Sequence, residues 1–266
     1  MRIFLSRTLH AYAAPLTVLA LSTAFAQAAL AAGSAAFDIS ATFTSGGINT
    51  GINPVNRLVG GGSPNYQKGS SFGPYQKTLP IATGPSPIPT LTVSATKLRS
   101  NVHGAFGVDT ISAEGDAAVG GLDLSLQLYP PPPGGPFPQP FLHITAATLQ
   151  GSGYYNLVVP SFTTVGSSAE VKKLTISGSL VGNKTLTFSG MPDANKVLFQ
   201  SPTVTITLNH RFVAGLISCS PKCVFTPASV NSSALEITLT DADLNGHKVS
   251  GQIEIGASEA GSELPL

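Results

Sequence analysis

The stretch LEITLTDADLNGHKVSGQIEI, Leu235 to Ile255, carries the clearest local signal for the fold. Apolar residues alternate with polar ones in LEITL and again in QIEI, which is the period of a β-strand with one buried face. Asn245-Gly246 lies between these segments, and this dipeptide is the strongest short signal for a two-residue hairpin. The stretch therefore predicts two antiparallel strands joined by a tight turn.

The same turn admits a second interpretation. Asp241, Asp243, Asn245 and Gly246 match the opening D-x-D-x-N-G of a calcium-binding loop. Position 12 of such a loop is a bidentate Glu, whereas the twelfth residue counted from Asp241 is Gln252. We therefore expect a hairpin, and we keep calcium, bound by Asp241, Asp243 and Asn245, as the one cofactor that the sequence suggests.

Two similar strand pairs precede this stretch. LTVSATKL (91–98) is followed by an alternating segment at 112–126, and LHITAATL (142–149) is followed by one at 167–180. Each pair exposes an apolar face that it cannot bury alone, so several pairs must pack together. No segment after the first 28 residues shows helical periodicity over three turns. We predict an all-β protein, an antiparallel β-sandwich built from repeated strand pairs, with a β-solenoid stack as the alternative.

The remaining segments divide the chain into further parts. Residues 1–28 have the Arg2 and Arg7 charges, the apolar run and the small-residue cleavage sites of a secretory signal peptide. Residues 29–90 are predicted to be an N-terminal strand followed by an arm rich in Gly, Pro and Asn, before a β domain at 91–258. Residues 259–266 are predicted to be a disordered tail. No later apolar run reaches the length of a transmembrane anchor.

Composition limits the classes of partner. Charged residues make up 10% of the chain, below the usual ~25%. Without Arg2 and Arg7 the balance is 12 Lys and Arg against 13 Asp and Glu, a net charge of −1. Nucleic-acid binding requires a clustered positive field, so this class of partner is excluded. The composition is typical of a secreted β-protein, extracellular or, alternatively, periplasmic.

The two cysteines lie in CSPKC, Cys219 to Cys223. Two nearby cysteines in an oxidising compartment usually form a disulfide. Residues four apart in an extended strand lie ~13 Å from each other, too far for a disulfide. The chain must therefore turn at Ser220-Pro221-Lys222, and the sequence predicts a disulfide that closes a short loop.

Signatures of catalysis are absent from the sequence. It contains no G-x-S-x-G, no H-E-x-x-H and no phosphate-binding loop, and its histidines are isolated. The pairs Glu114/Asp116 and Asp241/Asp243 have a spacing that places both carboxylates on one face of a strand. For ligand binding, Tyr154 and Tyr155 are the candidate aromatic platforms.

The second half of the chain resembles a known family. LTISGSLVG, MPDANKVLF, VTITLNHRF, LEITLTDADL and GQIEIGASEA occur in the order seen in bacterial choice-of-anchor P proteins, over about residues 90–260. The resemblance implies an exported protein with a β-rich ectodomain and no catalytic residues. Nothing after Ser258 matches an anchoring signal, so free secretion or periplasmic residence is expected rather than surface anchoring.

These observations favour a non-catalytic function. We expect a secreted β-protein that acts as a cell-surface, matrix or ligand-binding module, adhesin-like or lectin-like, with a glycan or a protein as partner. The alternative is a secreted hydrolase that acts on a polysaccharide, which requires two carboxylic acids across a cleft.

Overall fold

The described part of the protein consists almost entirely of β-strands. The computed structural model describes residues 32–61, 65–107, 110–130, 139–158, 162–219 and 223–261. The predicted signal peptide, residues 1–28, lies outside the described residues. The elements are β1 (Gly33–Ser45), β2 (Ile48–Val55), β3 (Leu58–Gly61), β4 (Asn65–Phe72), β5 (Tyr75–Pro80), β6 (Ile88–Ala95), β7 (Lys97–Phe106), β8 (Thr110–Tyr129), β9 (Leu142–Val158), β10 (Phe162–Ser177), the 3-10 turn η1 (Ser179–Val181), β11 (Leu186–Gly190), β12 (Lys196–Gln200), β13 (Val204–Cys219), β14 (Cys223–Leu244) and β15 (His247–Gly261). In the described part of the chain, no helix is long and apolar enough to cross a membrane.

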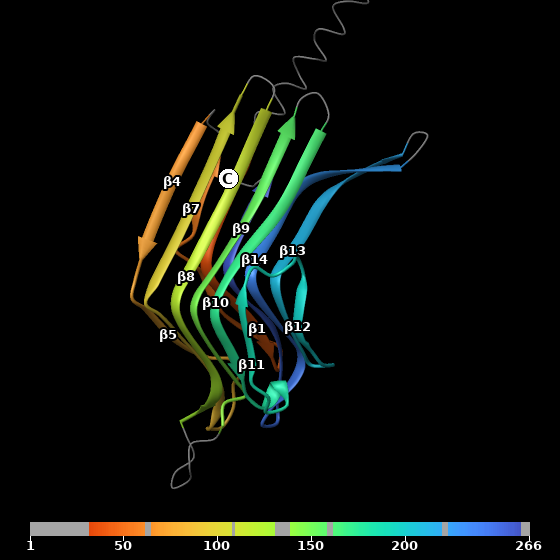
Figure 1. Cartoon of the computed structure of the whole chain (residues 1–266). Coiled ribbons are helices and arrows are strands. Elements are labelled where there is room, and N and C mark those ends of the chain that lie inside the picture. The colour runs from red at the N-terminus through yellow and green to blue at the C-terminus, as the bar shows by residue number, and fades with distance from the viewer. Residues whose placement is uncertain are drawn as a thin grey trace, which may run out of the picture.

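The strands form two antiparallel sheets packed face to face (Figure 1). The seven-stranded sheet has the order β12-β13-β14-β15-β1-β2, with β3 also paired to β1. The eight-stranded sheet has the order β11-β10-β9-β8-β6-β5, and β7 and β4 extend it from β8. This arrangement confirms the predicted sandwich and excludes the solenoid alternative.

The three strand pairs expected from the sequence all form. β6 pairs with β8, β9 with β10 and β14 with β15, each antiparallel. One detail differs from the expectation: the segment 91–98 is divided between β6 and β7, whereas its counterpart 142–149 lies within the single strand β9. The β14–β15 hairpin is confirmed at Asn245-Gly246, where φ is 59° and 86° and Leu244 pairs with His247.

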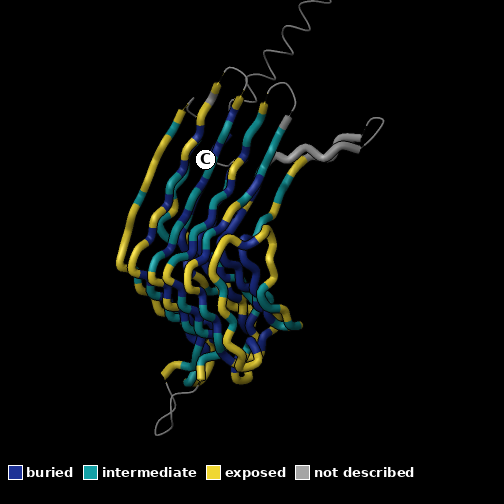
Figure 2. Tube along the Cα trace, viewed as in Figure 1, coloured by how far each residue is buried: buried dark blue, intermediate teal, exposed yellow. Residues whose placement is uncertain are grey.

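Alternating side chains form the core between the sheets. Figure 2 shows buried and exposed residues alternating along many of the strands. The main cluster is made of large aliphatic side chains, including Leu91, Leu124, Ile144, Ile237 and Ile253, all completely buried. Burying each such side chain contributes ~1.5 to 3 kcal/mol. This half of the sandwich, next to β11 and β12, is therefore thick and apolar.

The other half of the interface is built from small residues. Gly115 of β8 lies so close to β1 that a Cβ atom there would be 2.3 Å from the carbonyl oxygen of Ala35. A Cβ atom on Gly151 of β9 would be 2.3 Å from the carbonyl oxygen of Gly256 in β15. The two sheets therefore approach each other almost backbone to backbone here, and only glycine leaves room for that contact.

Asp38 of β1 joins the two sheets at the boundary between these halves. Its side chain is completely buried. Oδ1 accepts hydrogen bonds from the backbone N–H groups of Arg99 and Ala118, both at 3.2 Å, across the interface in β7 and β8. Oδ2 accepts from Asn56 Nδ2 at 2.6 Å and from Ser100 Oγ at 3.3 Å. Burial raises the pKa of Asp38 to about 6, against the opposing effect of these hydrogen bonds.

Two predicted boundaries are wrong. Residues 29–90 were expected to be an N-terminal strand followed by a Gly-, Pro- and Asn-rich arm, but most residues after the first strand form β2, β3, β4 and β5, which pair with β1, β7 and β6. The disordered tail expected at 259–266 is wrong for Glu259 to Gly261, which belong to β15 and pair with both β1 and β14, and residues 262–266 lie outside the described residues. In both places, pairing with distant strands orders a segment whose composition alone favours a loop.

Candidate functional site

A row of polar side chains crosses the outer face of the eight-stranded sheet. Gln67 of β4 pairs with His103 of β7, His103 pairs with Glu114 of β8, and Glu114 pairs with Tyr154 of β9. Directly opposed residues on neighbouring strands lie on the same face, with Cβ atoms ~5 Å apart. The four side chains therefore form one continuous row, which we call the Tyr154 row.

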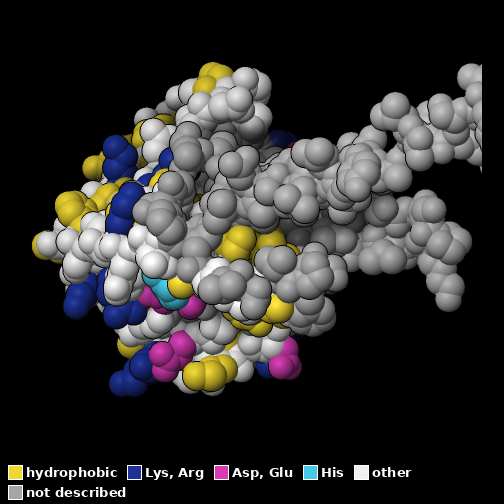
Figure 3. Space-filling model, turned by 90° about the horizontal axis from the view of Figure 1, so that it is seen from above, with side chains coloured by type: hydrophobic (Ala, Val, Ile, Leu, Met, Phe, Trp, Pro, Cys, Tyr) yellow, Lys and Arg dark blue, Asp and Glu magenta, His cyan; other side chains and the backbone are white. Residues whose placement is uncertain are grey.

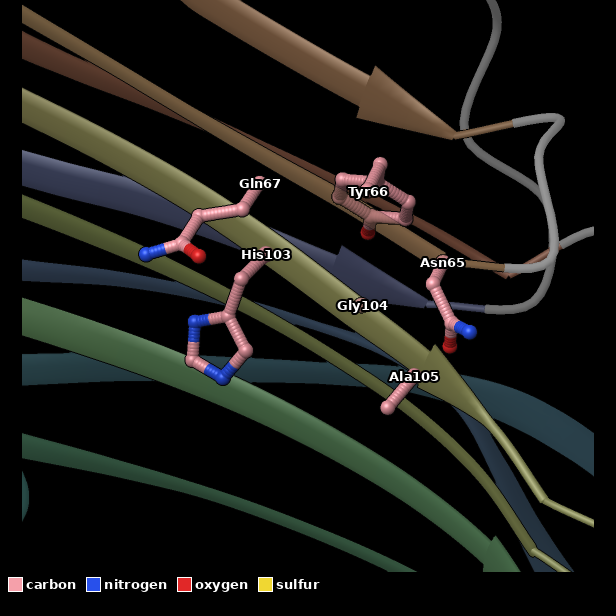
Figure 4. A pocket seen from close by; sticks show the side chains of 6 residues that line it. All are labelled: Asn65, Tyr66, Gln67, His103, Gly104 and Ala105. Carbon is pink, nitrogen blue, oxygen red and sulfur yellow. The ribbon is translucent and has the colours of Figure 1, made fainter.

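The Tyr154 row begins at a shallow depression at the β4–β7 edge. Figure 4 shows Gln67 and His103 side by side in this depression. Its volume is about 570 Å³, and Asn65 and Ala105 line its other end. His103 Nε2 lies 3.4 Å from Glu114 Oε2, and both side chains are accessible to solvent. Hydrogen-bond donors and acceptors are thus available to a ligand along the row.

Tyr154 supplies the aromatic surface of the row. Its side chain is 44% exposed, and it lies across Gly166 of β10. A Cβ atom at Gly166 would be 2.3 Å from Tyr154 Oη and 2.4 Å from Cζ, so the ring rests directly on the glycine backbone. The missing side chain at residue 166 therefore lets the aromatic ring lie against the sheet.

A second polar row runs beside the first. The Asp116 carboxylate accepts hydrogen bonds from Gln150 Nε2 at 2.6 Å, from Asn101 Nδ2 at 2.9 Å and from Arg99 Nη2 at 3.4 Å. Further along the row, Ser152 Oγ and Ser168 Oγ lie 2.9 Å apart. These contacts fix the side chains next to the Tyr154 row and neutralise the Asp116 charge, leaving a polar surface with little net charge.

The charge distribution agrees with this description. Seen from above, basic, acidic and hydrophobic side chains lie side by side on the described part of the surface (Figure 3).

Sequence reasoning missed a second group, on the outer face of the seven-stranded sheet. Glu236 of β14 pairs directly with Glu254 of β15, which pairs with Ser40 of β1. His210 Nδ1 contacts Glu236 Oε2, and Ser40 Oγ donates a hydrogen bond to Glu254 Oε2 at 3.2 Å. A groove of about 670 Å³ begins at Glu254 and extends over β1 and β2.

The environment raises the pKa values of two side chains in this second group, Glu254 and His210. Burial raises the pKa of Glu254, and the negative charge of Glu236 raises it further. The hydrogen bond to Glu236 raises the pKa of His210, against the opposing effect of burial. The alternation in VTITLNHRF, LEITL and QIEI was visible in the sequence, but only the strand register places Glu236 beside Glu254.

The structure separates the two predicted tyrosines. Tyr155 is only 4% exposed and packs with Ile111 and Val230 between the sheets, so it is not accessible as a platform. Successive residues of a strand point to opposite faces, which is why Tyr154 and Tyr155 differ.

The carboxylates of the predicted calcium ligands are bound within their own hairpin. Ser250 Oγ donates a hydrogen bond to Asp241 Oδ1 at 3.0 Å, and the Gly246 backbone N–H donates to Asp243 Oδ1 at 2.7 Å. Lys248 Nζ lies 3.6 Å from Asp243 Oδ2. Asn245 has a positive φ at the turn itself. Within the described ranges, no three His, Cys, Asp or Glu side chains are grouped to hold a metal ion, and calcium binding stays a prediction.

The predicted disulfide has a compatible backbone. Cys219 and Cys223 are directly opposed partners at the end of the β13–β14 hairpin, and residues 220–222 lie outside the described residues. Opposed residues of an antiparallel pair have Cβ atoms ~4.5 to 5.5 Å apart, which a small adjustment brings to disulfide distance.

We expect titration of the denatured protein with a thiol reagent to find no free thiol before reduction and two thiols per chain after it. Cys219→Ser is the matched control, because it leaves one thiol that reacts without reduction. Two reactive thiols in the unreduced protein would contradict the disulfide.

Comparison with family models, with curated proteins and with solved structures finds no match for this chain. The resemblance to the choice-of-anchor P proteins therefore stays a prediction.

Proposed function

We propose that this chain is a secreted, non-catalytic binding module of the cell surface or extracellular matrix, and that its ligand is a neutral glycan bound along the Tyr154 row. The exposed Tyr154 ring resting on Gly166 is the observation that supports this most directly. An aromatic ring with an accessible face offers an apolar surface to a sugar ring. Glu114, His103 and Gln67 then provide acceptors and donors for sugar hydroxyls beside it.

The shape of the face also favours a polymer over a small molecule. The row spans β4, β7, β8 and β9, whose neighbouring strands are spaced ~4.8 Å apart. The four side chains therefore cover ~14 Å in a line. An open row of this length fits several consecutive sugar units of a polysaccharide, whereas a small ligand is usually enclosed in a pocket.

Tyr154→Ala is expected to weaken polysaccharide binding about 10- to 30-fold, because truncating a central aromatic contact typically costs ~1.4 to 2 kcal/mol. The measurement is isothermal titration calorimetry with the best neutral polysaccharide from a glycan array. Tyr129→Ala is the matched control, because Tyr129 is 57% exposed but lies at the far end of β8. Equal losses in both variants, or no array binding by the wild type, would contradict the proposal.

The alternative, a polysaccharide hydrolase, is supported by Glu236 and Glu254. A retaining glycosidase uses two carboxyl groups ~5 to 5.5 Å apart, one of which must hold a proton, and the raised pKa of Glu254 suits the proton donor. A hydrolysis screen on the same polysaccharides separates the two functions. Turnover that is lost in both Glu236→Gln and Glu254→Gln supports the hydrolase, whereas binding without turnover supports the module.

A further inference from the structure

One edge of the eight-stranded sheet is only half covered. β10 pairs with β9 from Phe162 to Ser177, but on its other side β11 pairs only with Val171 to Ile176. In the described part of the chain, no strand pairs with the free side of residues 162–170. A free edge presents unpaired backbone N–H and C=O groups to any strand that approaches it.

This edge lacks the features that protect the other edges of the sandwich. Natural sheets block their edges with lysines, prolines, bulges or very short strands. The other edge strands have these features. Lysines lie in β4 (Lys68), β5 (Lys77) and β12 (Lys196), and prolines lie in β5 (Pro80) and β2 (Pro54). The register shifts in β2 and in β12, and β11 is only five residues long. Residues 162–169, FTTVGSSA, contain no Lys, Arg or Pro, and their register with β9 is continuous.

The apolar side chains next to this edge are not fully covered. Val165 of β10, Leu157 of β9 and Val213 of β13 are only partly buried around the small cluster that contains Tyr155. The Ser167 hydroxyl is buried and has no hydrogen-bond partner among the described residues. A strand added to β10 would cover these apolar groups with alternate side chains and would bring polar backbone groups close to Ser167.

The β13–β14 hairpin extends beyond the sheet to which it belongs. β15 accompanies β14 only as far as Ser229, whereas β13 and β14 stay paired to Cys219 and Cys223. Among the described strands, residues 215–219 and 223–227 therefore pair only with each other, and Figure 1 shows this pair projecting away from the sandwich. We call residues 215–219 and 223–227 the arm. An isolated two-stranded hairpin is marginally stable in water, so the arm gains stability from a further strand.

We propose that the arm of one molecule adds to the free β10 edge of a second copy of this chain. The described strands of the arm, GLISC (215–219) and CVFTP (223–227), contain no charged residue, and residues 162–169 have none either, so no like charges oppose the contact. The arm supplies the strand that the β10 edge lacks, and the β10 edge supplies the third strand that stabilises the arm.

Donor and acceptor are different surfaces of the same molecule. A contact of this type is heterologous, so each molecule that accepts an arm still has its own arm to donate. Such contacts build open filaments unless the rotation between copies closes a ring. The protein therefore polymerises through β-strand addition, independently of any glycan bound at the Tyr154 row.

The test uses two variants that each lack one half of the contact. Val165→Lys places a charge at the acceptor edge, and Thr163→Lys is a second edge variant in case the first is unstable. In the arm-less variant, residues 215–228 are replaced by Asn-Gly, which joins Ala214 to Ser229 across their existing pair. Ser71→Lys on the β4 edge is the matched control. Circular dichroism and thermal melting check that each variant is folded.

Light scattering after size-exclusion chromatography, with electron microscopy, gives the readout. The wild type and Ser71→Lys are expected to form concentration-dependent oligomers, and the edge and arm-less variants are expected to be monomers. An equimolar mixture of an edge variant and the arm-less variant is expected to give a 1:1 dimer that grows no further. A monomeric wild type, an arm-less variant that still assembles, or a mixture that stays monomeric would each overturn the proposal, as would oligomers that persist in denaturant until they are reduced.

Discussion

Asp38→Asn is expected to remove most of the pH dependence of stability between about pH 4 and pH 7. The wild-type Asp38 carboxyl has a pKa of about 6 in the folded protein against 3.8 for the unperturbed side chain. The folded state therefore binds this proton more tightly than the unfolded state does. Stability is highest below the unfolded pKa and falls as the pH rises through the folded pKa, by about 3 kcal/mol in total.

The asparagine keeps the shape and the acceptor of the carboxyl group but does not ionise. Its Oδ1 still accepts from the backbone N–H groups of Arg99 and Ala118. Its Nδ2 would face the Nδ2 of Asn56, and both groups are donors. The Asn56 amide can rotate to present its oxygen instead, because its other partner, the Ser70 hydroxyl, can both donate and accept. The free energy of unfolding from urea denaturation at several pH values is the measurement.

Asp38→Ala provides the contrast at the same residue. It leaves two buried backbone donors without an acceptor, at a cost of about 1 to 3 kcal/mol each, so this variant is less stable than Asp38→Asn at every pH. The raised pKa values of Glu254 and His210 contribute slopes of the same sign to the wild type, and they persist in both variants. A slope in Asp38→Asn as steep as in the wild type would show that Asp38 does not titrate between the sheets.

Gly151→Ala is expected to destabilise the protein by about 3 kcal/mol or more, although it adds one methyl group. The new Cβ atom would be 2.3 Å from the Gly256 carbonyl oxygen and 2.8 Å from the Ala234 backbone nitrogen. Both contacts are to backbone atoms of the opposite sheet, so no side chain can move aside. The two sheets must separate, and the small-residue contacts around them are then lost.

Gly120→Ala is the matched control, since it lies in the same sheet and its nearest contact would be an ordinary 3.7 Å. Gly115→Ala is an independent second variant that meets the Ala35 carbonyl oxygen in β1. Thermal melting of the three variants is expected to give large decreases for Gly151→Ala and Gly115→Ala and a small change for Gly120→Ala. Similar melting temperatures for all three would contradict the close approach of the sheets.

The candidate site could be predicted only in part. Tyr154 was identified from its residue type, and strict alternation could also have placed Tyr155 on the opposite face. Glu114 was noted only for its spacing to Asp116. Its place in a row with Gln67 and His103 depends on three separate strand pairings, none of which is encoded locally. Segment 45–90 has the composition of a loop, and it is ordered as strands because β1, β6 and β7 pair with it.

By itself the sequence determined the class of the fold, the three strand pairs and the Asn245-Gly246 hairpin. These features depend on alternation and turn chemistry, which act over a few residues. The tertiary structure alone decided that Asp38 is buried between the sheets, that Glu236 opposes Glu254, and that no described strand covers half of the β10 edge. Each of these depends on the register and the end points of strands far apart in the chain, where a shift of one residue would turn every side chain to the other face.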